Sequence, residues 1–281
     1  MKRKIKYVIN MHARRITKSV IKTNLALISR LKTSIQSINN TNNIYMLMYH
    51  RVNDYRNNEM SISVKEFKKQ VVWLKEMGFQ NMRMAELELM TPDSILKSPK
   101  VIFSFDDGYK DNFIKAFPVL KEFGYTAIFY IPHAPIGKQD MYPRDIMESN
   151  HLEHNQIMDW QNVENMYKAG MEIGSHTLTH KDLTQMNDVQ AKKEIIESKT
   201  KIEEKLGAPI TSFCYPGGYF HEKHIDWVKE AGYLSACTTE TGYYNGESLF
   251  KIPRIAVLAS DSFFIFKQKI VGDNKLFKIV R

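Results

Sequence analysis

The sequence predicts an α/β fold in which a parallel sheet closes into a distorted (β/α) barrel. From residue 44 onward, short apolar runs alternate with longer segments of helical periodicity, a pattern typical of parallel strands covered by helices. The chain has 281 residues, 43% of them hydrophobic and 25% charged, which is enough for one large core. We therefore expect one domain at residues 44–281, preceded by a leader at residues 1–43.

Seven segments are predicted to be strands, because each is short, apolar and bounded by Gly, Pro or polar residues. In chain order they are Ile44–Tyr49, Val101–Phe105, Thr126–Ile131, Met171–Gly174, Ser212–Tyr215, Tyr233–Thr238 and Ile252–Val257. Helices are expected between most of them. One begins at a capping box formed by Ser63 and Glu66, and others are predicted at 109–123, 161–169, 188–206 and 222–231.

The net charge of +9 belongs to the start of the chain. The first 53 residues hold 11 of the 40 Lys and Arg and none of the 31 Asp and Glu, which leaves 29 basic and 31 acidic residues in the rest. The body is thus close to neutral, and we expect no nucleic-acid partner.

The leader has no apolar run of about 7–15 residues, so the sequence predicts neither a signal peptide nor a membrane-spanning helix. Its apolar residues instead recur at helical spacing between Ile16 and Ile38, with Lys and Arg mostly off that stripe. This pattern indicates a basic amphipathic helix. It suits peripheral membrane contact through residues 1–38, or a helix packed on the domain, or a solvated tail. A cytoplasmic or peripheral membrane location is favoured over secretion.

Polar side chains follow four of the predicted strands. His50 ends the first, Asp106 and Asp107 end the second, His176 follows the fourth with His180 beyond it, and Tyr215-Pro216 ends the fifth. Because the carboxyl ends of parallel strands open on one face, we expect these groups to build one site.

The residue types at this face predict metal-assisted hydrolysis. Two adjacent carboxylates at the end of a buried strand are not both comfortably ionised without a cation nearby. His176 and His180 are four residues apart, which would place both imidazoles on one side of a helical turn, and one carboxylate completes a two-histidine, one-carboxylate ligand set. The other Asp could then act as general base toward a water that attacks an acyl bond. Taken singly, each motif also reads as an ordinary turn or helix cap.

At these residues the chain resembles the polysaccharide deacetylases, the NodB-homology or carbohydrate esterase family four enzymes. Phe103-Ser104-Phe105-Asp106-Asp107-Gly108-Tyr109 is similar to their first motif, and Ser175-His176-Thr177-Leu178-Thr179-His180 to their second. The resemblance spans roughly residues 44–258 and is greatest for the branch of poly-N-acetylglucosamine deacetylases. It implies a seven-stranded barrel of the NodB type and removal of N-acetyl or O-acetyl groups from an acetylated amino-sugar polysaccharide or its precursor.

The resemblance also assigns roles. It implies a divalent metal, zinc first with cobalt, nickel or iron as alternatives, bound by Asp107, His176 and His180. Asp106 becomes the general base, and the backbone N–H of Tyr215, followed by Pro216, is expected to stabilise the oxyanion. Trp160 is a candidate for stacking on a sugar ring.

The sequence departs from the family pattern in ways that leave alternatives open. The motif that usually carries an Arg beside the base Asp reads Phe213-Cys214-Tyr215-Pro216 here, and an Asp-x-x-Asp-Trp segment is not found near Cys237. No His follows His224, so the usual general acid is missing; His50 and, after it, His133 are the candidates in its place, and the alternative is that no dedicated histidine acid exists. A non-catalytic carbohydrate-binding homologue and a glycoside hydrolase remain the alternative functions.

Overall fold

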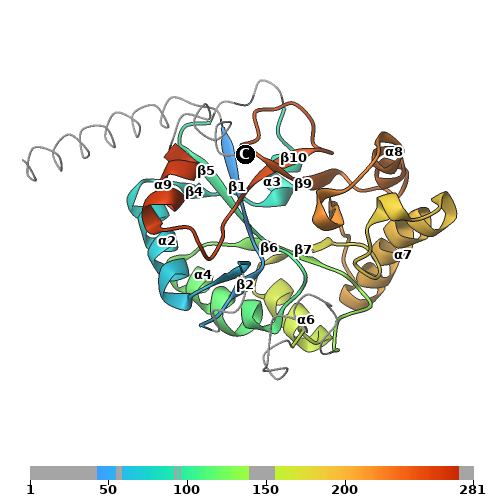
Figure 1. The fold of residues 1–281 in the computed structure, drawn as a ribbon, viewed down its shortest axis with the longest axis horizontal. Helices are drawn as coiled ribbons and strands as arrows, with labels where there is room; N and C mark the ends of the chain where they lie inside the picture. Colours follow the sequence, from blue (N-terminus) through green and yellow to red (C-terminus); the bar gives the residue numbers. More distant parts are fainter. Residues whose placement is uncertain (1–42, 55–58, 92–93, 95, 139–155, 272–281) are drawn as a thin grey trace, which may run out of the picture.

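The computed structural model describes residues 43–271 except 55–58, 92–93, 95 and 139–155. Its centre is a closed barrel of seven parallel strands (Figure 1). In spatial order the strands are β1 (Ile44–Tyr49), β10 (Ile252–Ala256), β9 (Ser235–Thr241), β8 (Ser212–Cys214), β7 (Glu172–Ser175), β6 (Ala127–Ile131) and β5 (Lys100–Phe105). The barrel closes because β1 pairs with β5 as well as with β10. The predicted fold class is confirmed.

All seven predicted strands are present. The largest displacement is at β9, which begins at Ser235 instead of Tyr233 because the Tyr233 N–H donates to the Val228 carbonyl and closes the preceding helix. Three very short strands were not predicted: β2 (Arg51–Val52), β3 (Ser61–Ile62) and β4 (Gln80–Asn81), the last of which extends the sheet beside β5.

Helices line the outside of the barrel (Figure 1). In chain order they are α2 (Val64–Glu76), α4 (Phe117–Phe123), α6 (Trp160–Lys168), α7 (Asp188–Leu206) and α8 (Glu222–Glu230), and all but α4 lie within a few residues of the prediction. The predicted cap of α2 is confirmed, because Ser63 Oγ accepts from the Glu66 N–H at 3.2 Å. The segment predicted as one helix at 109–123 is divided: a π-helical turn, η1 (Asn112–Ala116), comes first, and α4 follows it directly.

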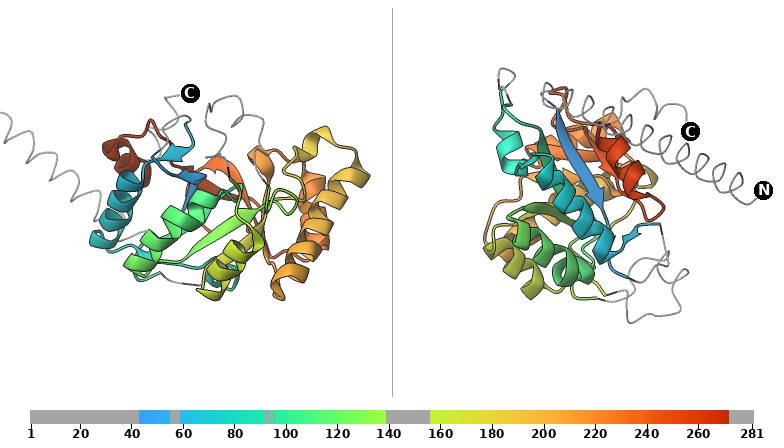
Figure 2. Two further views of the ribbon diagram at one scale, coloured as in Figure 1. Left: turned by 90° about the horizontal axis from the view of Figure 1, so that it is seen from below. Right: turned by 90° about the vertical axis from the view of Figure 1, so that its left-hand side faces the viewer.

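Two helices were not predicted. The helix α9 (Phe263–Val271) ends the described chain beside α2 (Figure 2), where the rings of Trp73 and Phe266 lie 5.8 Å apart. The short helix α3 (Met84–Glu88) covers the amino-terminal end of the strands, and the Glu172 carboxylate at the start of β7 accepts from the N–H groups of Met84 and Ala85 at 2.7 and 2.9 Å.

The barrel interior is apolar toward the amino-terminal ends of the strands and polar at their carboxyl ends. Side chains of alternate strand positions meet inside it: Ile44, Met46, Ile102, Ile128, Tyr130, Cys214, Cys237 and Ile252, with Met84 and Leu87 of α3 beneath them. On β5 the same inward face continues from Ile102 through Ser104 to Asp106, since alternate residues of a strand share a face. Among the described residues no helix is long and apolar enough to cross a membrane.

Candidate active site

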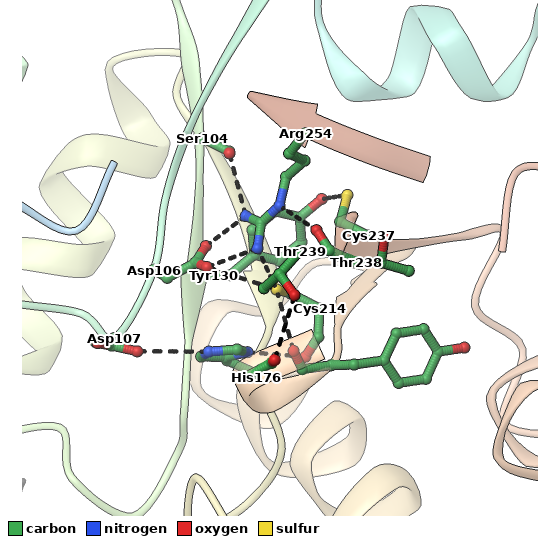
Figure 3. A network of polar contacts seen from close by, with 12 residues as sticks. Ser104, Asp106, Asp107, Tyr130, His176, Cys214, Cys237, Thr238, Thr239 and Arg254 are labelled. Carbon is green, nitrogen blue, oxygen red and sulfur yellow. Dashed lines mark hydrogen bonds and ion pairs between the residues drawn. The ribbon is translucent and has the colours of Figure 1, made fainter. Parts of the chain in front are cut away.

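Asp106 points into the barrel and is held there by Arg254, a residue of β10. The two guanidinium NH groups of Arg254 donate to the two carboxylate oxygens of Asp106 at 2.7 Å each (Figure 3). Arg254 also donates to the Thr238 carbonyl at 2.9 Å and to Ser104 Oγ at 3.2 Å. Both members of the pair are almost fully buried, with 0% and 3% of their side chains exposed, so this bidentate contact fixes the carboxylate rigidly.

This pair corrects one inference from the sequence. An Arg that orients Asp106, the expected base, is not missing; it comes from β10 and not from the segment after β8. At the latter place Cys214 occupies the space, with its Sγ 3.1 Å from an Arg254 NH group and 3.7 Å from Asp106 Oδ2. Burial raises the pKa of Asp106, but the charge and hydrogen bonds of Arg254 outweigh it and leave the pKa below its ordinary value.

Asp107, His176 and His180 form a second cluster beside this pair. Asp107 Oδ1 lies 2.9 Å from His180 Nε2 and 3.4 Å from His176 Nε2. Their ligand atoms all lie within 4.8 Å of one another. Burial raises the pKa of Asp107, yet the two imidazoles outweigh it and the pKa lies well below its ordinary value. The sequence predicted that Asp107, His176 and His180 lie at one site, and in the structure they form one cluster.

The loop that brings the two histidines together is not the expected helical turn. After β7 ends at Ser175, the chain turns sharply without forming a helix. Asp107, Thr177 and His180, with φ of 72°, 68° and 62°, are the non-glycine residues with positive φ in the described part of the chain. Left-handed backbone is costly for residues with a Cβ, above all for a β-branched threonine, and such strain gathers at functional sites.

The donor set fits a divalent metal. His176 Nδ1 lies 2.8 Å from the Cys214 carbonyl, which can only accept, so Nδ1 carries a proton and Nε2, which faces Asp107, is the ring nitrogen available to a metal. Two imidazole nitrogens and one carboxylate oxygen, with no fourth protein ligand among the described groups, match a catalytic zinc site, although other first-row metals accept the same set.

The other predicted site residues are placed as follows. Burial lowers the pKa of His50. The charges of Asp107, Asp106, Arg254 and His176 also act on this pKa, so His50 lies near both clusters. His133 packs its ring 5.3 Å from half-buried Trp160. Burial lowers the pKa of His133, and the strongest charges on it are those of Lys201 and Lys205, which lie outside the cluster.

The role expected for the Tyr215 N–H is wrong in this structure. That group donates to the Cys237 carbonyl at 3.2 Å, because the pairing of β8 with β9 continues one residue past the end of β8. The Tyr215 ring is fully buried and stacks on Phe220 at 4.5 Å. Pro216 is buried too and begins a tight turn, η4 (Pro216–Gly218), which leaves the strand end beside the cluster.

Sequence reasoning missed Arg254 and Cys214 as neighbours of the base. A signal was present, since an arginine inside an otherwise apolar strand must find a buried partner. Both cysteines are free and buried.

Comparison with known proteins defines the class. The sequence profile of the polysaccharide deacetylase family matches residues 94–236. The chain is 30% identical to the putative polysaccharide deacetylase YxkH of Bacillus subtilis (strain 168) over 75% of its own length and 70% of that protein. The chain therefore belongs to the polysaccharide deacetylase family, whose members are hydrolases acting on non-peptide carbon–nitrogen bonds.

More distant relatives agree with this class. The poly-beta-1,6-N-acetyl-D-glucosamine N-deacetylase of Escherichia coli (strain K12) is 24% identical over 82% of this chain, which spans only 39% of that protein. The structure of IcaB from Ammonifex degensii has the same fold, with a TM-score of 0.70 and 20% identity over 82% of this chain and 97% of that one.

Proposed function

We propose that this chain is a metal-dependent deacetylase that removes N-acetyl groups from a polymer of N-acetylated amino sugar or from its glycan precursor. The observation that carries the proposal is the pairing of two clusters at one strand end. Asp107, His176 and His180 form a ligand set, and the neighbouring Asp106 is held by Arg254. The relative from Escherichia coli, named as a poly-beta-1,6-N-acetyl-D-glucosamine N-deacetylase, supports this substrate class.

Asp107, His176 and His180 would hold the metal, which when bound lowers the pKa of water and polarises the acetyl carbonyl. Asp106 accepts the proton of the water whose oxygen attacks the carbonyl carbon. Its low pKa keeps it ionised at neutral pH, and the two bonds from Arg254 fix the direction in which its lone pairs point.

The leaving amine needs a proton when the carbon–nitrogen bond breaks, and we assign its transfer to His50. Burial lowers the pKa of His50, so it is neutral in the resting site and must first receive the proton that Asp106 has taken. His133 is disfavoured for this role because lysines, and not the site carboxylates, dominate its surroundings. The half-buried ring of Trp160, beside His133, remains our candidate for stacking on a sugar ring.

The test is acetate release from N-acetylglucosamine oligomers by the purified full chain, with and without a chelator. Asp106→Asn is the matched control, because it keeps shape and removes the base. Release that the chelator and the substitution both abolish supports the proposal. Reducing ends without acetate would indicate a glycoside hydrolase, and stoichiometric metal without any turnover would favour a carbohydrate-binding homologue.

The leader suggests where the enzyme works. Residues 1–38, which lie outside the described residues, carry the basic amphipathic pattern, and we propose peripheral contact with an anionic membrane surface. Sedimentation with vesicles containing anionic lipid should bring down the full chain but not a truncation that begins at Ile44. Equal behaviour of the two proteins would contradict this proposal.

A further inference from the structure

The buried face of α7 carries two polar residues where apolar ones are expected. Five residues of this helix are buried: Ala191, Glu194, Ile195, Ser198 and Ile202. Glu194 is 5% exposed and Ser198 0%. Burial of a carboxylate is costly unless hydrogen bonds compensate it, so a glutamate in this stripe needs partners.

Each of these two polar residues contacts the residue directly before a histidine of the cluster. Glu194 contacts Thr179, in the loop after β7, and Ser198 contacts Ser175, the last residue of β7. The Thr179 N–H donates to Glu194 Oε2 at 2.7 Å and the Thr179 hydroxyl to Glu194 Oε1 at 2.6 Å. Ser198 Oγ lies 2.7 Å from Ser175 Oγ. One turn of α7 separates Glu194 from Ser198, and four residues likewise separate His176 from His180 (α7 lies at the right of Figure 1).

The two histidines differ in how much else holds them. The side chain of His176 is 2% exposed, and the Cys214 carbonyl fixes its Nδ1 at 2.8 Å. That of His180 is 26% exposed. The His180 N–H donates to Thr177 Oγ1 at 3.0 Å, and both residues have left-handed backbone. A costly backbone conformation persists only when the surrounding structure enforces it. Glu194 of α7 contributes to this by holding Thr179, the residue before His180, with two hydrogen bonds.

We infer that Glu194 is a positioning residue of the metal site, acting through Thr179 to hold His180 within reach of Asp107. The opposite side of the loop is held by backbone bonds, from the His133 and Ala134 N–H groups to the Thr177 and Leu178 carbonyls at 3.3 and 2.8 Å. Glu194 thus adds a side-chain anchor from α7 to the backbone bonds on the other side of the loop. This inference rests on the proposed metal site.

The experiment measures zinc affinity of the purified full chain by competition with a chromophoric chelator, with no substrate present. Glu194→Gln replaces one acceptor oxygen by an NH₂ group, so one of the two Thr179 donors loses its partner. Loss of a hydrogen bond made directly to a metal ligand weakens metal binding about 10- to 100-fold; because Glu194 acts through Thr179, we expect a loss near the lower end of that range. Glu204→Gln is the matched control, since Glu204 lies on the same helix but is exposed, and it should leave the affinity unchanged.

A second pair of variants keeps the inference testable if Glu194→Gln does not fold. Thr179→Val removes the hydroxyl donor and keeps the shape, and should weaken zinc binding, whereas Thr179→Ser keeps the donor and should restore it. Thermal melts of the metal-free proteins separate the two roles. Variants with lower melting temperature but unaltered zinc affinity would show a merely structural residue and overturn the inference. Absence of zinc binding by the unaltered chain would overturn the metal site itself, and the inference with it.

Discussion

Replacement of Arg254 by methionine should destabilise the protein strongly. The substitution preserves apolar volume near the barrel axis but leaves Asp106 ionised, buried and without the two 2.7 Å bonds that now satisfy it. Removal of one partner from a buried ion pair costs about 3–5 kcal/mol. Arg254 is entirely buried and makes further bonds to Thr238 and Ser104, so we expect the upper half of that range.

Urea unfolding followed by circular dichroism measures this cost. Lys68→Met is the matched control, because Lys68 and Glu122 lie 2.8 Å apart with about half of each side chain exposed, a surface pair that should contribute about 0–1 kcal/mol. In the double variant with Asp106→Asn no charge remains unpaired, so its loss should be smaller than the sum of the two single losses. A cost below about 1 kcal/mol for Arg254→Met, or strictly additive losses, would refute the argument that this pair is a coupled buried unit.

Three further outcomes are expected. Asp107→Asn should abolish tight zinc binding, seen by metal analysis after dialysis, while the far-ultraviolet circular dichroism stays unchanged; retained stoichiometric zinc would contradict the ligand assignment. Burial lowers the pKa of His224 to about 4, whereas the unfolded chain titrates near its usual value of about 6.5. Protons therefore favour the unfolded state, and thermal stability should fall as the pH drops from about 6.5 toward 4; His224→Gln should flatten this slope, and an unaltered slope would refute the assignment. Gly218→Ala should lower the melting temperature more than Gly78→Ala, because both residues have positive φ but only at Gly218 would the new Cβ collide with Thr239; equal shifts would show that the turn after β8 can relax.

The fold was largely predictable because its strands are local signals. Each barrel strand is a short apolar run between polar residues, and α7 has an asparagine cap and a left-handed glycine at its ends, so its predicted bounds, 188–206, are those of the structure. The small elements were not predictable in this way. The helix α3 has five residues, and its N-terminus is satisfied by Glu172, which lies far away in sequence. Only tertiary contacts make such an element stable.

The site also has a part that could be predicted from the sequence and a part that could not. Asp107, His176 and His180 could be grouped from the sequence, because strand ends of a parallel barrel meet on one face. The contact of Arg254 with Asp106 could not, since it depends on closure of the barrel, which brings β10 beside β1 and across from β5. The engagement of the Tyr215 N–H was missed although the predicted strand included Tyr215, because its oxyanion role was taken from the family resemblance and not from the pairing of this strand with β9.

The left-handed backbone at Asp107, Thr177 and His180 ties metal capture to the integrity of the whole barrel. An unfolded chain rarely holds three such residues in that conformation at once, so the ligand set exists as a unit only in the native state. Metal would then bind the folded chain in preference to the unfolded one, and zinc at 100 times its dissociation constant would add about 2.7 kcal/mol to stability. Loss of the metal would therefore lower the stability of the folded chain in addition to removing the reactive centre.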